Sequence, residues 1–234
     1  MIFNNILGII MGNSELALVD CPDDQTKKKL ELIFNQTLPG KNLTRNLVAF
    51  AKDQELKQKF FRINEKIDLV VSLMKKDLEG IELLKDESSG VPELLADPGM
   101  IEHALVNLIQ NSIHATSMVE QPQIIIRTFY QDKNIYIEIE DNGCGILEEN
   151  IDRIYEPAFT MKGSNDRTSS YKFGIKGTGY GMANVKKYIE LHKGNILIDS
   201  TVGMGTKITI SFPVIKKELT QKEIIEIQKD NFYF

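Results

Sequence analysis

The chain has 234 residues, enough for one ordinary domain and a smaller additional element. Its hydrophobic fraction of 42% and charged fraction of 26% are typical of soluble globular proteins. The net charge of −5 gives no electrostatic argument for nucleic acid as a partner. The two cysteines, Cys21 and Cys144, form no CxxC pair, which argues against a disulfide framework or a zinc site and favours the reducing cytoplasm.

The first residues, MIFNNILGIIMG, are apolar but do not have the features of a signal peptide. A basic n-region is missing, and the polar residues Asn4 and Asn5 interrupt the apolar run. The chain has no stretch of about 20 apolar residues, so we expect no membrane-spanning segment in it.

The first 60 residues predict a helical hairpin. Residues 3–19 and 25–60 each carry apolar side chains at spacings close to the helical period. The turn Cys21-Pro22-Asp23-Asp24 separates them, and an Asp there can cap the second helix. Pro39-Gly40 lies inside the second segment, where we expect a kink or a break. Because one hairpin cannot bury both apolar stripes, we expect residues 1–60 to dimerise into a four-helix bundle.

From about residue 60 the pattern predicts alternating strands and helices. The clearest helix covers residues 97–117, whereas residues 66–73 fit either a strand or a short helix. The other expected elements are a strand at 80–84, a polar turn at 86–90, a β-hairpin of residues 123–130 and 134–141, a short helix at 148–154, a mobile loop at 160–176, a helix at 181–192 and a second hairpin of residues 195–200 and 206–213. The tail from residue 216 has a composition that allows a helix.

Three motifs in a fixed order indicate a nucleotide pocket, and the first is the helical segment NLIQN. It places Asn107 and Asn111 four residues apart, so both amides project from one helix face. Mg²⁺ prefers oxygen ligands and keeps several waters, so Asn111 is a candidate ligand and Asn107 would orient a water or a phosphate. The alternative is that neighbouring loops satisfy both amides. His114 would face the same side, although a lone helical histidine is more often structural.

The second motif, DNGCG, follows the alternating run of a strand. The carboxylate of Asp141 could accept a hydrogen bond from an exocyclic amine such as that of adenine. Gly143 and Gly145 would allow close backbone approach. The alternative is an ordinary turn after a strand, because Asp-Asn-Gly sequences are common in turns.

The third motif, GTGYG, is a glycine-dense segment that leads into a helix. Gly177, Gly179 and Gly181 would present backbone N–H groups at the helix N-terminus, an arrangement that favours anions. A flexible hinge is the alternative, and the spacing fits neither the P-loop nor the dinucleotide fingerprint. The preceding segment carries basic residues that form either a solvated face or a lid over phosphates: Lys162, Arg167, Lys172 and Lys176.

The ordered set of motifs resembles the ATP-binding boxes of sensor histidine kinases. NLIQN resembles the N box, DNGCG and GTGYG the two glycine boxes, Glu156–Lys162 the F box, and Gly203-Met204-Gly205-Thr206 the late Gly-x-Gly-Thr turn. The resemblance covers residues 65–214 as the ATP-binding domain and residues 1–60 as the dimerisation and phosphoacceptor hairpin, and it leaves 215–234 as a tail. It implies an α+β fold in which the hairpin precedes a GHKL-type α/β sandwich with a mixed sheet.

The resemblance also implies roles for single residues. Asn111 would hold Mg²⁺ with help from Asn107, and Asp141 would bind the adenine amine of ATP beside Gly143 and Gly145. Thr206 would support the adenine side, and Phe159 would help to position the lid. The remaining residues that we assign to the nucleotide site are His114, Lys162, Gly177, Thr178, Gly179, Tyr180 and Gly181. The implied partners are a second copy of the chain and the receiver domain of a response regulator.

The chain departs from the family pattern at its N-terminus. Phe3-Asn4-Asn5 match the hairpin motif, but Met1 stands where the phosphoacceptor histidine belongs and Ile2 where its acidic neighbour belongs. The three histidines, at positions 103, 114 and 192, all fall in the nucleotide domain. Either the acceptor has been cut away or altered, or the protein is a natural relative that does not autophosphorylate there.

Three functions therefore remain open. The first is a histidine-kinase core, and the second is a dimeric interaction module that docks a regulator or another kinase and uses ATP as a conformational ligand. The third is a GHKL ATPase of the gyrase, chaperone or mismatch-repair type. That third class carries a glutamate at the position of Asn107 and a transducer domain, for which this chain has no room.

Overall fold

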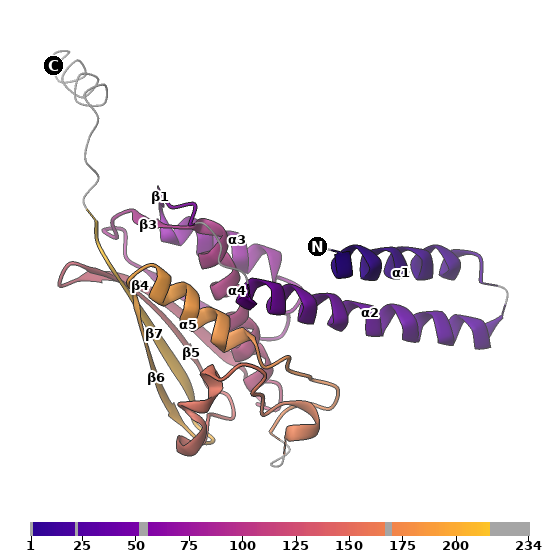
Figure 1. Cartoon of the computed structure of the whole chain (residues 1–234). Helices are drawn as coiled ribbons and strands as arrows, with labels where there is room; N and C mark the ends of the chain where they lie inside the picture. The colour runs from indigo at the N-terminus through magenta and orange to yellow at the C-terminus, as the bar shows by residue number, and fades with distance from the viewer. Residues whose placement is uncertain (1, 22, 52–55, 167–169, 216–234) are drawn as a thin grey trace, which may run out of the picture.

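The computed structural model describes residues 2–21, 23–51, 56–166 and 170–215, and it begins with two packed helices. Helices α1 (Ile2–Val19) and α2 (Asp24–Ala51) lie side by side and project away from the remainder of the chain (Figure 1). The carboxylate of Asp23 accepts a hydrogen bond from the backbone N–H of Thr26 at 2.8 Å. The predicted aspartate cap of the second helix is therefore confirmed.

Helix α2 passes through Pro39-Gly40 without interruption, so of the predicted kink or break the break is wrong. Gly40 faces Leu7 of α1, whose Cδ atoms would lie 3.7 Å from a Cβ at residue 40. Packing against α1 along the helix outweighs the one backbone hydrogen bond that a proline removes. The predicted extension of this helix to residue 60 is also wrong, because α2 ends at Ala51 and residues 59–61 form a strand.

A five-stranded mixed sheet forms the base of the remaining chain. Its strands are β2 (Glu82–Glu87), β4 (Gln123–Gln131), β5 (Asn134–Asp141), β7 (Gly205–Pro213) and β6 (Asn195–Thr201), in that spatial order. Strand β2 is parallel to β4, and every other neighbouring pair is antiparallel. Both predicted β-hairpins are therefore confirmed. A separate two-stranded sheet pairs β1 (Lys59–Phe61) with β3 (Leu94–Ala96).

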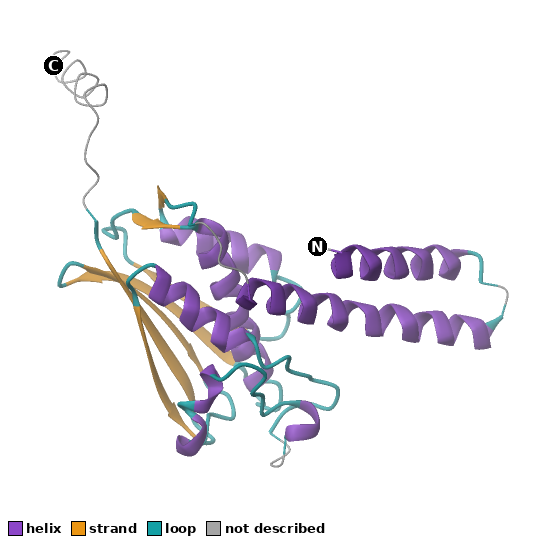
Figure 2. Cartoon of the chain, in the orientation of Figure 1, coloured by secondary structure: helices purple, strands orange, loops and turns teal. Residues whose placement is uncertain are grey.

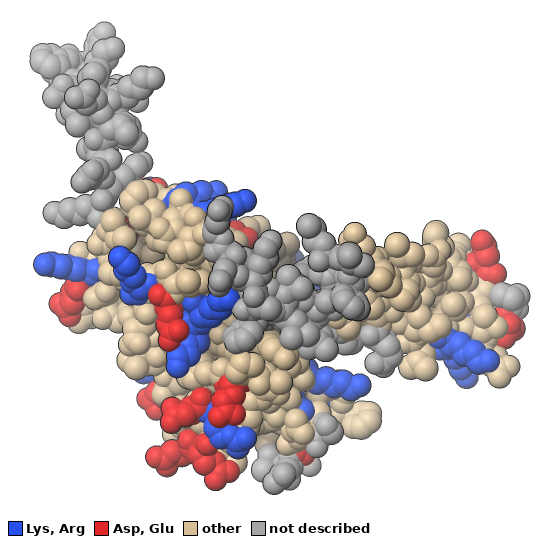
Figure 3. All heavy atoms as spheres, in the orientation of Figure 1, with Lys and Arg blue, Asp and Glu red and all other residues tan. Residues whose placement is uncertain are grey.

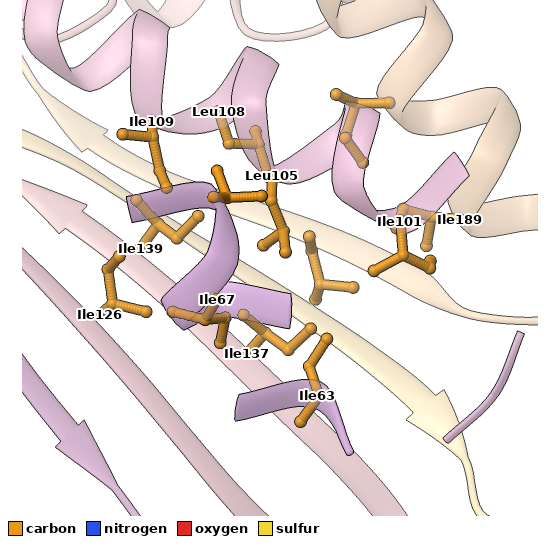
Figure 4. Packing of buried hydrophobic residues seen from close by; sticks show 14 of the residues in the cluster. Ile63, Ile67, Ile101, Leu105, Leu108, Ile109, Ile126, Ile137, Ile139 and Ile189 are labelled. Carbon is orange, nitrogen blue, oxygen red and sulfur yellow. The ribbon is translucent and has the colours of Figure 1, made fainter. Parts of the chain in front are cut away.

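Three helices cover one face of the five-stranded sheet (Figures 1 and 2). They are α3 (Ile63–Leu73), α4 (Pro98–Ala115) and α5 (Gly181–Leu191). Alternate residues of β4 and β5 point toward the helices, which is the pattern of a sheet with one buried face. Figure 4 shows the resulting core, in which Ile67, Leu105, Leu108, Ile126, Ile137 and Ile139 are all fully buried.

Several boundaries differ from the sequence-based expectations. Residues 66–73, for which strand and helix were both open, belong to helix α3. Strand β2 begins two residues after the predicted start and continues into the predicted polar turn, because its pairing with β4 supplies partners that no local pattern reveals. The predicted helix at 148–154 is wrong. Two short 3₁₀ turns, Glu148–Asn150 and Arg153–Tyr155, replace it.

The predicted fold class, helices packed with a mixed sheet in a GHKL-type sandwich, is confirmed by this architecture. In the described part of loop 160–176, residues Gly163–Asn165 form a 3₁₀ turn. In the residues that the structure describes, no helix combines the length and apolar character needed to cross a lipid bilayer. Met1 and residues 216–234, which include most of the predicted tail, lie outside the described residues.

Candidate functional site

A cavity of about 520 Å³ lies between helix α4, the start of α5, the ends of strands β5 and β7, and loop 160–176. Of the residues predicted for the nucleotide site, the cavity is lined by Asn107, Asn111, His114, Asp141, Gly145, Phe159, Lys162, Gly177, Thr178, Gly179, Gly181 and Thr206. Gly143 and Tyr180 are not among its lining residues. The structure thus brings together residues from positions 107 to 206 in a single hollow of ordinary ligand-site size.

Helix α4 is fixed at its first turn, and this determines where its amides point. Oδ1 of Asp97 accepts hydrogen bonds from the backbone N–H groups of Gly99 and Met100, and Pro98 follows as the first helical residue. Nε2 of His192 accepts the backbone N–H of Asp97 at 2.9 Å. Oδ2 of Asp97 accepts the backbone N–H of Lys57 at 3.0 Å, so the cap also holds the segment that leads in from α2.

The two predicted amides lie one turn apart on the cavity side of α4. Asn107 donates through Nδ2 to the backbone carbonyl of His103 at 2.8 Å, which directs its oxygen toward the first residue of α5. A Cβ on Gly181 would lie 3.0 Å from that oxygen. The Oδ1 atom of Asn111 accepts a hydrogen bond from the Lys162 ammonium at 2.7 Å. The amide oxygen of Asn111 therefore already interacts with a cation.

Asp141, the last residue of β5, supplies a buried carboxylate to the cavity. Its side chain is 8% exposed and accepts the backbone N–H of Gly143 at 3.0 Å. Burial raises the pKa of this carboxyl, while hydrogen bonds from Ser112, Gly143 and Thr206 oppose the rise. Thr206 lies directly across from Asp141 in the β5–β7 register. One face of the cavity thus presents a fixed acceptor for a ligand N–H group.

Two glycines at the site are required by the backbone. Gly145 has φ +70°, and a Cβ there would lie 2.2 Å from the carbonyl oxygen of Thr201. Gly179 has φ +76°, and a Cβ there would lie 2.3 Å from the carbonyl carbon of Ala158. Gly143 packs differently, because its Cβ would collide with Ala115 of α4. A glycine is therefore needed at this position because the chain after β5 passes close to α4, and Gly143 does not form part of the cavity wall.

Lys162 and His114 form a polar cluster with Asn111 at the cavity wall. The Lys162 ammonium lies 3.0 Å from Nδ1 of His114, and the Gln110 amide lies 3.1 Å from Nε2 of the same ring. Burial and the nearby Lys162 charge lower the pKa of His114 to about 4. Burial lowers the pKa of Lys162 to about 8. At neutral pH the imidazole is therefore uncharged and accepts from a mainly protonated lysine.

Sequence reasoning missed several cavity residues. Gln110 and Tyr171 contribute polar atoms, while an apolar wall consists of Ile146, Ile154, Met182 and Ile208. Gln110 could have been found, because it lies four residues before His114 on the same helix. Tyr171 lies in an irregular loop, and no local pattern links it to α4. Phe159 lines the cavity as expected, and the Arg153 guanidinium lies 4.5 Å from its ring centroid.

The residues present fit a nucleotide with a hydrated divalent cation. A buried carboxylate beside an apolar wall suits a base that donates an N–H group, and the glycine segment before α5 offers backbone donors for phosphates. The contact between Asn111 and the Lys162 ammonium shows that this amide oxygen is placed to hold a positive charge. Within the described ranges no cluster of three His, Cys, Asp or Glu side chains could bind a metal, so phosphate oxygens would complete a shell at Asn111.

Comparison with known proteins identifies the family. The sequence profile of the histidine kinase-, DNA gyrase B- and HSP90-like ATPases matches residues 96–216, which include all the motifs assigned to the nucleotide site but not the hairpin motif. The chain belongs to this ATPase family. The predicted resemblance to sensor histidine kinases is confirmed by the relatives and the solved structures that this chain matches.

Two curated relatives illustrate the similarity. The sensor kinase CckA of Brucella abortus is 31% identical over 233 residues, which cover 92% of this chain and 23% of the relative. The sensor protein RprX of Bacteroides fragilis is 29% identical over 165 residues, covering 70% of this chain and 31% of the relative. This chain therefore spans a third or less of the length of these two relatives.

Solved structures show the same fold. Full-length ShkA in complex with AMPPNP matches with a TM-score of 0.75 at 19% identity, over 93% of this chain and 45% of that one. Histidine kinase ThkA in complex with the response regulator protein TrrA matches with a TM-score of 0.62 at 20% identity, over 90% of this chain and 58% of that one. Both matches extend beyond the ATPase fold into the helical hairpin, because each covers nine-tenths or more of the chain.

Proposed function

We propose that this chain is the ATP-binding core of a two-component sensor histidine kinase, which transfers the γ-phosphate of ATP to a histidine for relay to a response regulator. The observation that carries the proposal is the combination, in one cavity, of the buried Asp141 carboxylate and the Asn111 amide oxygen held by a cation. If these polar residues only stabilised the fold, the cavity would not need both a hydrogen-bond acceptor for a nucleotide base and a site for a cation.

The proposed mechanism assigns each wall of the cavity one task. Asp141 accepts the adenine amine, and backbone N–H groups of the segment 177–181 hold the phosphates. Asn111 supplies one oxygen to Mg²⁺, and Asn107 orients a water or a phosphate. The metal would neutralise charge on the transferred phosphoryl group. Catalysis in this class is mainly positioning and charge stabilisation, so no nucleophilic side chain is needed in the cavity.

The hairpin is the proposed dimerisation surface. Ile9 and Leu16 of α1 are 63% and 70% exposed, and Leu32 of α2 is 61% exposed. Figure 3 shows that the visible hairpin surface is largely uncharged, with acidic and basic residues gathered toward its turn. A second copy would cover this apolar face and form a four-helix bundle. The proposal predicts that Ile9→Lys shifts the chain from dimer to monomer in analytical ultracentrifugation.

The phosphoacceptor is the part of the proposal that needs a direct test, because residues 1–60 contain no histidine. Acid-labile phosphate from labelled Mg-ATP should be measured on this chain and on a version with an added start codon, Met1→His and Ile2→Asp. Label on the restored version alone would support a competent kinase core that lacks its acceptor. Label on the unmodified chain would contradict the assignment of the acceptor position.

The absence of a histidine from residues 1–60 also favours a second candidate, a dimeric interaction module that binds ATP without phosphorylating itself. Its partner would be a receiver domain or another kinase docked on the hairpin. ATP binding without label on either version would support this candidate. Both candidates place the chain in the cytoplasm, where ATP is available and where its two free cysteines remain reduced.

A further inference from the structure

The Lys162 ammonium lies where a metal ion would have to approach Asn111. It donates to Oδ1 of Asn111 at 2.7 Å and to Nδ1 of His114 at 3.0 Å. Both acceptors are neutral, and within the described residues no carboxylate lies within ion-pair distance of this ammonium. Its remaining contact is with the ring of Tyr171, whose centroid lies 5.8 Å away. A buried cation that contacts only neutral groups is not an arrangement that stability alone favours. The Lys162 cluster therefore calls for a role in ligand binding.

We infer that Lys162 is a placeholder for the metal: its ammonium holds Asn111 in the empty cavity and exchanges with Mg²⁺ when the nucleotide enters. This inference rests on the proposed function and extends it to the order of events at the site. A divalent cation and an ammonium on the same amide oxygen would be separated by only a few ångströms, where their repulsion exceeds one hydrogen bond. The amide oxygen of Asn111 can therefore bind either cation, but not both at the same time.

Release of Lys162 from Asn111 removes a contact between its loop and helix α4. The described part of loop 160–176 is attached to α4 through the Lys162 contacts with Asn111 and His114, and to the residues after α4 through a hydrogen bond from the Lys172 backbone N–H to Ser117 Oγ at 3.1 Å. Thr160 and Lys162 also lie against the glycine segment, since a Cβ on Gly177 would lie 2.2 Å from Thr160 Oγ1. A released Lys162 therefore remains beside the proposed phosphate donors and can pair with phosphate oxygens.

The exchange predicts an unusual dependence of nucleotide affinity on metal. Without Mg²⁺, Lys162 is the cation nearest Asn111 that can neutralise phosphate charge, so its removal should weaken ATP binding by about 30-fold in EDTA, the scale of one charged hydrogen bond. With Mg²⁺ present, the metal provides much of that charge, and the same removal should cost only about threefold. A phosphate contact that does not share Asn111 with the metal would show a smaller difference between the two conditions.

The experiment is calorimetric titration of ATP into the full chain, in EDTA and in Mg²⁺, with Lys162→Met compared with the unmodified protein. Lys176→Met is the matched control, because Lys176 lines the same cavity from the same loop, whereas the lysine that donates to Asn111 is Lys162. We expect the control to weaken binding by one common factor in both buffers. Thermal melts of each variant verify folding.

A second measurement reports on the empty protein. Hydrogen–deuterium exchange across loop 160–176 without nucleotide should be faster in Lys162→Met than in Lys176→Met, because only the first variant loses the fastening to α4. Equal losses of affinity in the two buffers, or unchanged exchange in the loop, would overturn the exchange while leaving the proposed function intact. Absence of ATP binding by the unmodified chain would overturn the proposed function and the exchange with it.

Discussion

Replacement of Asp141 by asparagine tests the assignment of the adenine acceptor. The substitution preserves shape but turns one of two acceptor oxygens into a donor. One oxygen already accepts the backbone N–H of Gly143 at 3.0 Å, so an asparagine that keeps this bond must direct its NH₂ toward the ligand. A donor would then face the exocyclic amine of adenine, and the hydrogen bond to the base would be lost.

The size of the effect follows from the burial of this carboxylate. Asp141 is 8% exposed, so water cannot replace the lost partner. A hydrogen bond to a charged group contributes about 1.5–3 kcal/mol, which corresponds to roughly 10- to 150-fold weaker ATP binding. Fold stability should change little or rise, because the raised pKa shows that burial already disfavours the charged form of Asp141.

Nucleotide selectivity provides the decisive assay. Inosine triphosphate has a carbonyl where ATP has the exocyclic amine, so the unmodified protein should bind it more weakly than ATP. In Asp141→Asn the asparagine NH₂ can donate to that carbonyl, and the preference for ATP should disappear or reverse. Competition against a fluorescent ATP analogue measures both affinities. Equal weakening of the two nucleotides, with the preference retained, would refute the assignment of Asp141 to the base.

Three further predictions concern the loop, the cluster at α4 and the helix cap. Gly179→Ala should weaken ATP binding in calorimetry more than Gly174→Ala. Both positions have positive φ, which costs an alanine about 1–2 kcal/mol, but only a Cβ at residue 179 would also collide with Ala158. The pKa of His114 is about 4 in the folded protein and 6.5 in its ordinary state, so the unfolded chain takes up a proton first as pH falls. The free energy of unfolding is therefore highest above pH 6.5, and the contribution of the neutral His114 to it is lost as pH falls toward 4. Over this pH range, the free energy of unfolding measured in urea should fall more for the unmodified protein than for His114→Gln, by at most about 3 kcal/mol. Parallel pH dependences of the two proteins would contradict the lowered pKa. Asp97→Ala removes the α4 cap and should cost about 1 kcal/mol, or roughly 2–4 °C in a thermal melt, whereas exposed Glu93→Ala should leave the melting temperature unchanged.

The parts of the fold that local pattern encodes were predictable from sequence. Helix α4 has a capping aspartate, a proline at its first position and an apolar stripe, and its observed bounds fall within two residues of the prediction. Strands β4 and β5 alternate strictly and are joined by a two-residue turn, Asp132-Lys133, so their pairing was also predictable. In each case the residues that determine the element lie within it.

The parts that depend on distant partners were not predictable. Strand β3 has three residues and exists because it pairs with β1, more than thirty positions earlier in the chain. The continuity of α2 at Pro39 depends on packing against α1, which local propensity does not describe. The contact between Lys162 and Asn111 joins residues 51 positions apart. The glycine motifs indicated a phosphate site, but only the structure identified which lysine faces the amide oxygen.

Helix α4 relates the hairpin to the cavity through one stiff element. Its cap, Asp97, accepts the backbone N–H of Lys57, which lies between α2 and strand β1. About 21 Å further along the same helix lies Asn111, at the wall of the cavity. The face of α4 that includes Leu105 and Leu108 is fully buried in the core, which resists independent bending of the two ends. The contact with Lys57 and the amide of the proposed metal site therefore lie at opposite ends of one buried helix.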